Sequence, residues 1–152
     1  MKSRRAQLLE FAVLGLLHEG PTHGYDLRRR LNTALGPFRA LSYGTLYPAR
    51  RDLLDHGLIA ETTDPAGPSG RRPRVVYELT AAGKEHFAEL VARTDASAYE
   101  DDGFDVRFAF FARTERDVRL RILEGRRSRV EEDLERVREA ATRSRERLDA
   151  YT

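Results

Sequence analysis

Three stretches with the apolar spacing of helices are followed by two short stretches with the composition of strands, and this order most limits the fold. The helical stretches cover residues 8–20, 20–36 and 41–57. The β-type runs at 58–64 and 75–79 bracket a loop that holds three of the six prolines. A hairpin after three helices is the order of a winged helix-turn-helix. The predicted fold class is therefore mainly α with a small β-hairpin (α+β), in which a winged helix-turn-helix domain precedes a helical, coiled-coil-like region.

The second helical stretch, GPTHGYDLRRRLNTALG, is expected to begin with its Pro-Thr pair. Thr22 is the predicted cap, because a hydroxyl at this position accepts a hydrogen bond from a free backbone N–H. Tyr25, Leu27 and Leu31 follow at helical spacing, and a Gly-Pro pair ends the stretch. The first two helices are therefore expected to meet at a tight turn.

The stretch LSYGTLYPARRDL, residues 41–53, places a proline inside the third predicted helix. Ser42 and Thr45 can each cap this helix, and we predict that it begins between them. Pro48 then lies close enough to the start that its missing N–H removes little. Gly44 lets the backbone approach a phosphate, which the N-terminus of a helix favours. We therefore interpret this stretch as the recognition helix, whose first turn enters the major groove of DNA.

A helical projection separates two sides of the recognition helix. Leu46 and Leu53 define the inward side, while Arg51 points outward and Tyr43 and Tyr47 lie on the flank. For Tyr47, a position at the edge of the core and a contact with a phosphate are both open.

The positive charge of the chain lies in its first part. Residues 1–94 hold 14 Lys and Arg against 10 Asp and Glu, whereas residues 95–152 hold 13 against 15. Repeated basic clusters between apolar segments are typical of a surface that binds a polyanion. Solvated helix faces are the alternative that charge alone leaves open.

The loop between the two β-type runs ends in the basic segment SGRRPR. A short basic tip of a hairpin can lie along a phosphate backbone or enter a narrow minor groove, and an ordinary solvated loop is the alternative. Together with the helices, this tip completes the predicted contacts with double-stranded DNA. The predicted DNA-binding residues are Tyr25, Ser42, Tyr43, Gly44, Thr45, Tyr47, Arg51, Arg71, Arg72 and Arg74.

A long final helix is predicted after Thr114, which forms a variant capping box with Asp117. Apolar residues recur along it at alternating intervals of three and four, as in a coiled coil, and Gly125 is a possible bend. Packing onto the chain's own domain is one explanation. A homodimer is preferred, because one small core cannot cover so long a stripe. The predicted dimer-interface residues are Leu120, Leu123, Val130, Leu134, Val137, Ala141 and Leu148.

An acidic segment that ends in glycine, at 100–103, predicts a break before this final region. We expect residues 1–94 to form the winged helix-turn-helix domain and residues 95–152 to form a helical dimerisation region. Aromatic residues gather around the break, and they are either core or the lining of an effector pocket, with core favoured by their helical spacing. These residues are Tyr99, Phe104, Phe108, Phe110 and Phe111.

Composition and motifs argue against an enzyme. The chain has no cysteine, and its four histidines lack the spacing of metal ligands, so neither a thiolate nor a zinc site is expected. GPSGRR lacks the Gly-Lys-Ser/Thr ending of a phosphate-binding loop. No cofactor is predicted. The longest apolar run, FAVLGLL, is too short for a bilayer, so a cytoplasmic protein without a membrane partner is expected.

Three segments together resemble the PadR family of transcriptional regulators: HEGPTHGYDLRRRL, LSYGTLYPARRDLLDHGLI and GRRPRVVYELTAAG. The family shows GP-x-HGYEL, then GTLYPAL followed by GLI, then R-x-Y-x-LT-x-x-G, so the resemblance covers about residues 8 to 92. It implies a dimeric DNA-binding regulator, usually a repressor that a small molecule or another signal releases. Arg50 departs from this pattern, since the family usually has leucine there.

A dimer suits the reading of a palindromic operator, because two recognition helices about 34 Å apart contact both half-sites on one face of the duplex. A protein-interaction adaptor, with the winged helix and coiled coil both binding protein, is the alternative function. Binding to DNA should fall steeply with salt, whereas adaptor binding need not.

Overall fold

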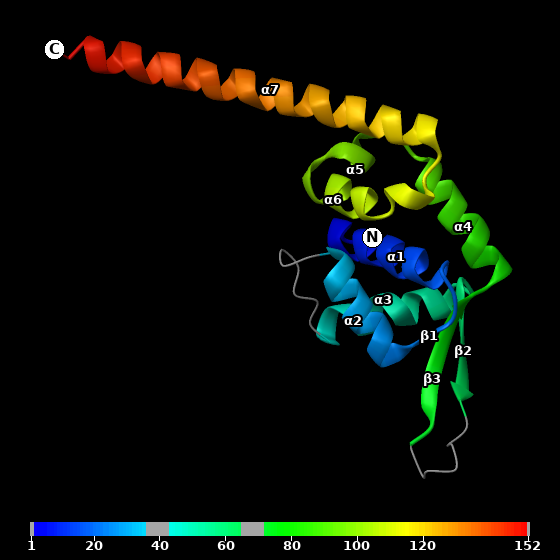
Figure 1. Ribbon diagram of the computed structural model, residues 1–152. Coiled ribbons are helices and arrows are strands. Elements are labelled where there is room, and N and C mark those ends of the chain that lie inside the picture. The colour runs from blue at the N-terminus through cyan, green and yellow to red at the C-terminus, as the bar shows by residue number, and fades with distance from the viewer. Residues whose placement is uncertain (1, 36–42, 65–71, 152) are drawn as a thin grey trace.

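The structure is a computed structural model that describes residues 2–35, 43–64 and 72–151. Helices dominate it, a small antiparallel sheet extends from one end, and one long helix runs along the other (Figure 1). The predicted α+β class is confirmed, although the sheet has three strands rather than two. The described elements are α1 (Arg4–Leu17), β1 (Thr22–His23), α2 (Gly24–Leu35), α3 (Tyr43–Asp55), β2 (Ile59–Asp64), β3 (Arg74–Leu79), α4 (Ala81–Ala92), α5 (Ala96–Tyr99), α6 (Asp101–Ala109), the 3₁₀ turn η1 (Phe111–Arg113) and α7 (Arg116–Asp149).

Helix α1 is the centre of the core. Ser3 caps it by accepting a hydrogen bond from the N–H of Ala6. Every residue from 9 to 17 is buried, because α2, α3, α4 and α6 all pack against this helix. The helix begins before the predicted range and ends at Leu17, three residues ahead of Gly20, whose φ of 150° suits a residue without a side chain.

The turn before α2 differs from the prediction. Thr22 does not cap the helix; it lies in β1, opposite Tyr77 of β3, and its hydroxyl donates to the carbonyl of Gly20. Helix α2 therefore begins at Gly24. The cap was wrong because pairing with a strand that lies far along the chain overrides a local helix signal.

Helix α3 begins at Tyr43, within the predicted interval, and continues through Pro48 to Asp55. Leu46 and Leu53 are buried against α1, as predicted. The chain then turns at Gly57, where φ is +69°, into β2. Strand β3 lies between β2 and β1, with Ile59 opposite Leu79 and Asp64 opposite Arg74.

Residues beyond the sheet complete the same core. Thr80 caps α4 by accepting a hydrogen bond from the N–H of Gly83, and Phe87 from α4 packs with Phe11 of α1 and with Phe110, which follows α6. The predicted break at 100–103 is absent at its glycine end, since Gly103 is buried inside α6, where a Cβ atom would lie 2.0 Å from the carbonyl oxygen of Ser97. Glycine is used there for close packing and not for a stop.

Helix α7 has 34 residues and is about 50 Å long. It runs away from the rest of the molecule after its first turns (Figure 1). The capping box predicted for its start is wrong. Thr114 is buried and donates to the carbonyl of Phe110, and Glu115 is the cap residue. Gly125 packs against the ring of Tyr99, so its role is close approach to α5.

Candidate nucleic-acid interface

The outer face of α3 carries polar and aromatic side chains. Arg51 is exposed and Tyr47 is 48% exposed, which agrees with their predicted placement away from the core. The guanidinium of Arg51 donates to the hydroxyl of Tyr47 at 3.2 Å. This hydrogen bond raises the pKa of Arg51 above its ordinary value, and a guanidinium is charged at neutral pH in any case.

Helix α2 presents Tyr25 beside α3. Tyr25 is 77% exposed, whereas Leu27 and Leu31 of the same helix are fully buried. An aromatic ring that the core does not use, at the start of a helix-turn-helix, is available for a contact with a partner.

The wing supplies two described arginines. Arg72 precedes β3 and Arg74 begins it, and both are exposed. Strand β3 projects with β2 away from the helical body, so these residues extend beyond the helices (Figure 1). Arg71 lies outside the described residues.

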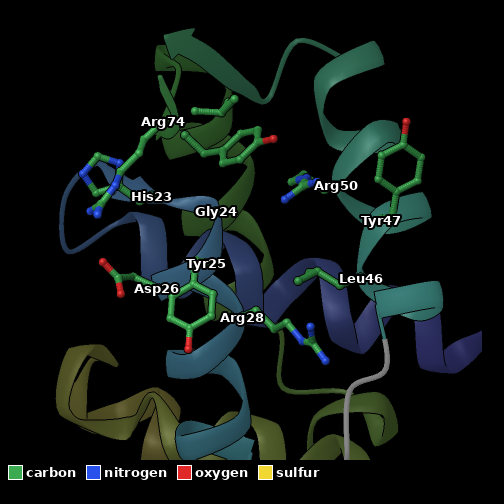
Figure 2. Close-up of a pocket in the computed structure, with 11 residues that line it drawn as sticks. His23, Gly24, Tyr25, Asp26, Arg28, Leu46, Tyr47, Arg50 and Arg74 are labelled. Carbon is green, nitrogen blue, oxygen red and sulfur yellow. The ribbon is translucent and has the colours of Figure 1, made fainter. Parts of the chain in front are cut away.

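A cavity of about 490 Å³ opens between α2, α3 and β3 (Figure 2). It brings together three of the predicted residues, Tyr25, Tyr47 and Arg74. Arg51 and Tyr47 line a second cavity of about 320 Å³ on the other side of Tyr77 and Arg50. Residues predicted from two helices and a strand thus share one surface. The lining of the first cavity is His23, Gly24, Tyr25, Asp26, Arg28, Leu46, Tyr47, Arg50, Arg74, Val75 and Tyr77.

Sequence analysis did not select Arg50, which is central to this surface. Its guanidinium carbon lies 4.6 Å from the ring centroid of Tyr77 and 5.7 Å from that of Tyr47. Such cation–π contacts hold a guanidinium in place and leave its N–H donors usable. The signal that could have found Arg50 is its departure from the leucine of the family pattern.

Some predicted residues are described in part or not at all. Ser42 lies outside the described residues, and for Tyr43 and Gly44 the structure describes the helical backbone alone. Thr45 is half-buried in the first turn of α3. Their contacts with DNA stay predictions.

The apolar stripe of α7 is left largely exposed by the residues that the structure describes. Of this helix, which is described throughout, only Ile122 is buried, and Ile122 was not part of the predicted stripe. Ala141 is exposed as well. The large apolar side chains of the stripe are 42–69% exposed: Leu120, Leu123, Val130, Leu134, Val137 and Leu148.

The aromatic residues at 99–111 divide into two groups. Phe110 is core, with its ring 5.4 Å from Phe11. Phe104, Phe108 and Phe111 pack on one another at centroid distances of 5.2–6.3 Å, and Phe108 is 58% exposed. The two cavities described above lie elsewhere, the first between α2, α3 and β3 and the second between α3 and the sheet.

The described residues lack the features of two other kinds of site. No group of three or more His, Asp or Glu side chains there could hold a metal ion. No described helix is both long and apolar enough to cross a membrane.

Sequence comparisons agree on one family. A family model described as "Transcriptional regulator PadR-like family" matches residues 13–89. A curated relative, "Negative transcriptional regulator PadR" of Bacillus subtilis, is 31% identical over 87 residues. These residues are 57% of this chain and 47% of the relative, so the chain spans about half the length of the curated relative that it matches.

Two solved structures are similar over most of the chain. One is Bacillus subtilis PadR in complex with operator DNA, with 24% identity and a TM-score of 0.51, which covers 87% of this chain and 73% of that one. The other is a conserved protein of unknown function described as a potential transcriptional factor. It has 24% identity and a TM-score of 0.52, and it covers 93% of this chain and 97% of that one. At this identity, both show a shared fold.

Proposed function

The chain belongs to the PadR-like family of transcriptional regulators, and from this premise we propose that it is a homodimeric repressor that binds a palindromic operator in double-stranded DNA. A small molecule or another signal releases it in this proposal. The family consists of transcriptional regulators and not enzymes, in agreement with the motifs of the sequence.

One observation carries the proposal: side chains from α2, α3 and the wing gather on one positively charged surface. Tyr25, Tyr47, Arg51 and Arg74 all line the two cavities of this surface or extend beside them. Base edges and phosphates must both be reached from a recognition helix, and aromatic and guanidinium groups serve these contacts. The fold that this chain shares with a protein solved on operator DNA supports the same assignment.

The proposed dimer rests on α7. Six large apolar side chains stand exposed along it, and a second copy would cover them in a coiled-coil-like interface. In this division of labour, residues 1–94 bind DNA and residues 95–152 set the distance between the two recognition helices. Tyr99 and the three packed phenylalanines lie at the start of the second of these parts, where a signal could act.

Selection of bound fragments from the source genome, followed by sequencing, tests the proposal directly. A recurrent palindrome among the bound fragments is the expected result. Binding to this operator should weaken steeply as salt rises, because each phosphate contact releases counterions. An affinity that does not change with salt concentration, or bound fragments without a shared sequence, would instead favour the protein-interaction adaptor.

Two substitutions then test where α3 sits on the DNA. Tyr43→Ala is expected to remove a base-edge contact, which costs about 1–3 kcal/mol on the operator and almost nothing on random DNA. Arg51→Ala removes a phosphate contact and should weaken binding to the operator and binding to random DNA to the same degree. Fluorescence titrations on an operator duplex and on a random duplex, with thermal stability checked, compare the two. Unchanged operator affinity for Tyr43→Ala would contradict the placement of α3 in the major groove.

A further inference from the structure

The cavity between α2, α3 and β3 receives an arginine from each of these elements. Arg28 comes from α2, Arg50 from α3 and Arg74 from β3 (Figure 2). Asp26 is the one acidic residue in the lining, so the cavity has two net positive charges when His23 is neutral. A concave surface with this excess concentrates anions, because a low-dielectric wall focuses the field of its charges.

Two aromatic rings fix the position of the Arg50 guanidinium in this cavity. The ring of Tyr77 holds this guanidinium at 4.6 Å, and Tyr47 flanks it. A Cβ atom on Gly24 would lie 3.3 Å from Nη1 of Arg50 and 3.2 Å from Cε2 of Tyr77. The absence of a side chain at Gly24 therefore leaves the room in which the guanidinium reaches the start of α2.

The N–H groups of the Arg50 guanidinium are available as hydrogen-bond donors to a ligand. Among the residues that the structure describes, no carboxylate forms an ion pair with Arg50 and no acceptor forms a hydrogen bond with it. A cation–π contact compensates part of the charge and leaves the planar fork of five N–H groups unused. A half-buried cation in this state is stabilised when an anion with several acceptor oxygens enters the cavity.

The surroundings favour a phosphate. The first residues of α2 face the cavity, and the free backbone N–H groups at the start of a helix favour an anion at that position. The rings of Tyr25 and Tyr47 form part of the cavity wall, while their hydroxyl groups point away from Arg50 (Figure 2). The cavity is also part of the surface proposed to face DNA, since Tyr25, Tyr47 and Arg74 belong to both.

We propose that this cavity binds one backbone phosphate of the operator, with Arg50 as its principal ligand. The proposal rests on the proposed function and names a contact at a position where the family pattern has leucine. Arg50 thus adds a phosphate contact that a leucine could not make, separate from the contact predicted for Arg51.

The test scans the phosphates of the operator with single neutral methylphosphonate linkages. We expect one linkage position at which neutralisation weakens binding of the parent protein and has no effect on Arg50→Leu. Arg51→Leu should stay sensitive at that position, because its own phosphate is another one. The salt slope is the steepness with which the logarithm of the binding constant falls as the logarithm of the salt concentration rises. Loss of one phosphate contact should lower this slope by about one unit in Arg50→Leu, whereas Arg50→Lys should keep the slope of the parent.

A matched control separates a local contact from net charge. Arg143 is exposed on α7, away from the apolar stripe and from the cavity, so Arg143→Leu makes the same change of charge elsewhere. Its salt slope should equal that of the parent. Thermal denaturation of each variant shows whether the fold is retained, and leucine is a residue that the family accepts at position 50.

Several results would overturn the proposal. A methylphosphonate scan in which Arg50→Leu loses affinity but no position becomes insensitive would make Arg50 a support for Tyr77 and the wing. If the scan shows no such position but inorganic phosphate raises the melting temperature of the parent and not of Arg50→Leu, the cavity serves a free phosphate instead. A parent protein that binds neither operator nor random DNA would overturn the proposed function itself, which is a different outcome from a DNA-binding parent unaffected by Arg50→Leu.

Discussion

Helices α1 and α7 use their apolar residues in opposite ways. Nine consecutive residues of α1 are buried by other parts of the same chain, whereas Ile122 alone is buried in the 34 residues of α7. Burial of apolar surface contributes a stabilising free energy of about 25 cal/mol for each Å² removed from water. The first helix therefore obtains this free energy within one chain, and the stripe of the last helix obtains it from a partner in the proposed dimer.

The largest expected effect follows from breaking the stripe. Leu134→Glu combined with Val137→Glu would place four carboxylates in the proposed interface of the dimer, and burial of unpaired charge is strongly unfavourable. We expect monomers at low micromolar concentration by light scattering. The matched control, Ser128→Glu with Thr142→Glu, places the same charges on exposed positions outside the stripe and should remain dimeric. A dimer that survives the stripe variant would place the interface elsewhere.

The same comparison explains which elements could be predicted from the sequence. Helix α3 and strands β2 and β3 are specified by local patterns, and their predicted positions agree closely with the structure. Strand β1 has two residues, and it exists because Thr22 and His23 pair with Tyr77 and Val76. A pairing across so many residues leaves no periodic pattern in the segment itself.

The errors in the C-terminal part have a different cause. Gly103 and Thr114 carry the signals of a helix stop and a helix cap, but contacts with residues six and four positions earlier in the chain give them other roles inside and after α6. Ile122 escaped prediction because it packs on the chain's own side of α7, out of register with the stripe. In the site, Tyr25, Tyr47 and Arg74 could be predicted from local sequence patterns. The role of Arg50 could not, because it depends on the rings of Tyr47 and Tyr77, which the fold brings to it.

A second prediction compares two apolar residues within α7. In the monomeric stripe variant, Ile122→Ala should lower the free energy of unfolding by about 2–5 kcal/mol, because it empties a buried site. Leu148→Ala should change it by less than about 0.5 kcal/mol, because this side chain is 69% exposed. Urea denaturation of the monomer gives both values without a contribution from dimerisation. Equal effects would mean that the end of α7 packs on its own chain.

A third prediction concerns Gly125, where α7 is anchored. Alanine would improve the helix by about 1 kcal/mol, but its Cβ would lie 2.5 Å from Cδ1 of Tyr99. Overpacking of this kind costs about 1–3 kcal/mol. We therefore expect Gly125→Ala to destabilise the protein. In a Tyr99→Ala background the ring is gone, and the same substitution should become stabilising. Urea denaturation of the parent, the two single variants and the double variant tests this reversal of sign. If Gly125→Ala changes the free energy of unfolding in the same direction in both backgrounds, Tyr99 is not the obstacle.

The smallest expected effect comes from Glu19, which connects the two regions. Its carboxylate forms ion pairs with Arg30 of α2 and with Arg113 of η1, and Arg113 also donates to the carbonyl of Gly15 at 2.9 Å. All three charged side chains are about one third exposed, so water and salt weaken the pairs. We expect Glu19→Gln to lower the free energy of unfolding by about 0.5–1 kcal/mol at low salt and by less at high salt.

The control is Glu131→Gln, which removes an ion pair with Arg127 that is more exposed and lies entirely within α7. Its effect should be nearer zero at both salt concentrations. Glu19 joins helix α2, which is proposed to contact DNA, to the segment that leads into α7. An effect no larger than that of Glu131→Gln would therefore mean that the core around Phe110, and not charge, holds these two segments together.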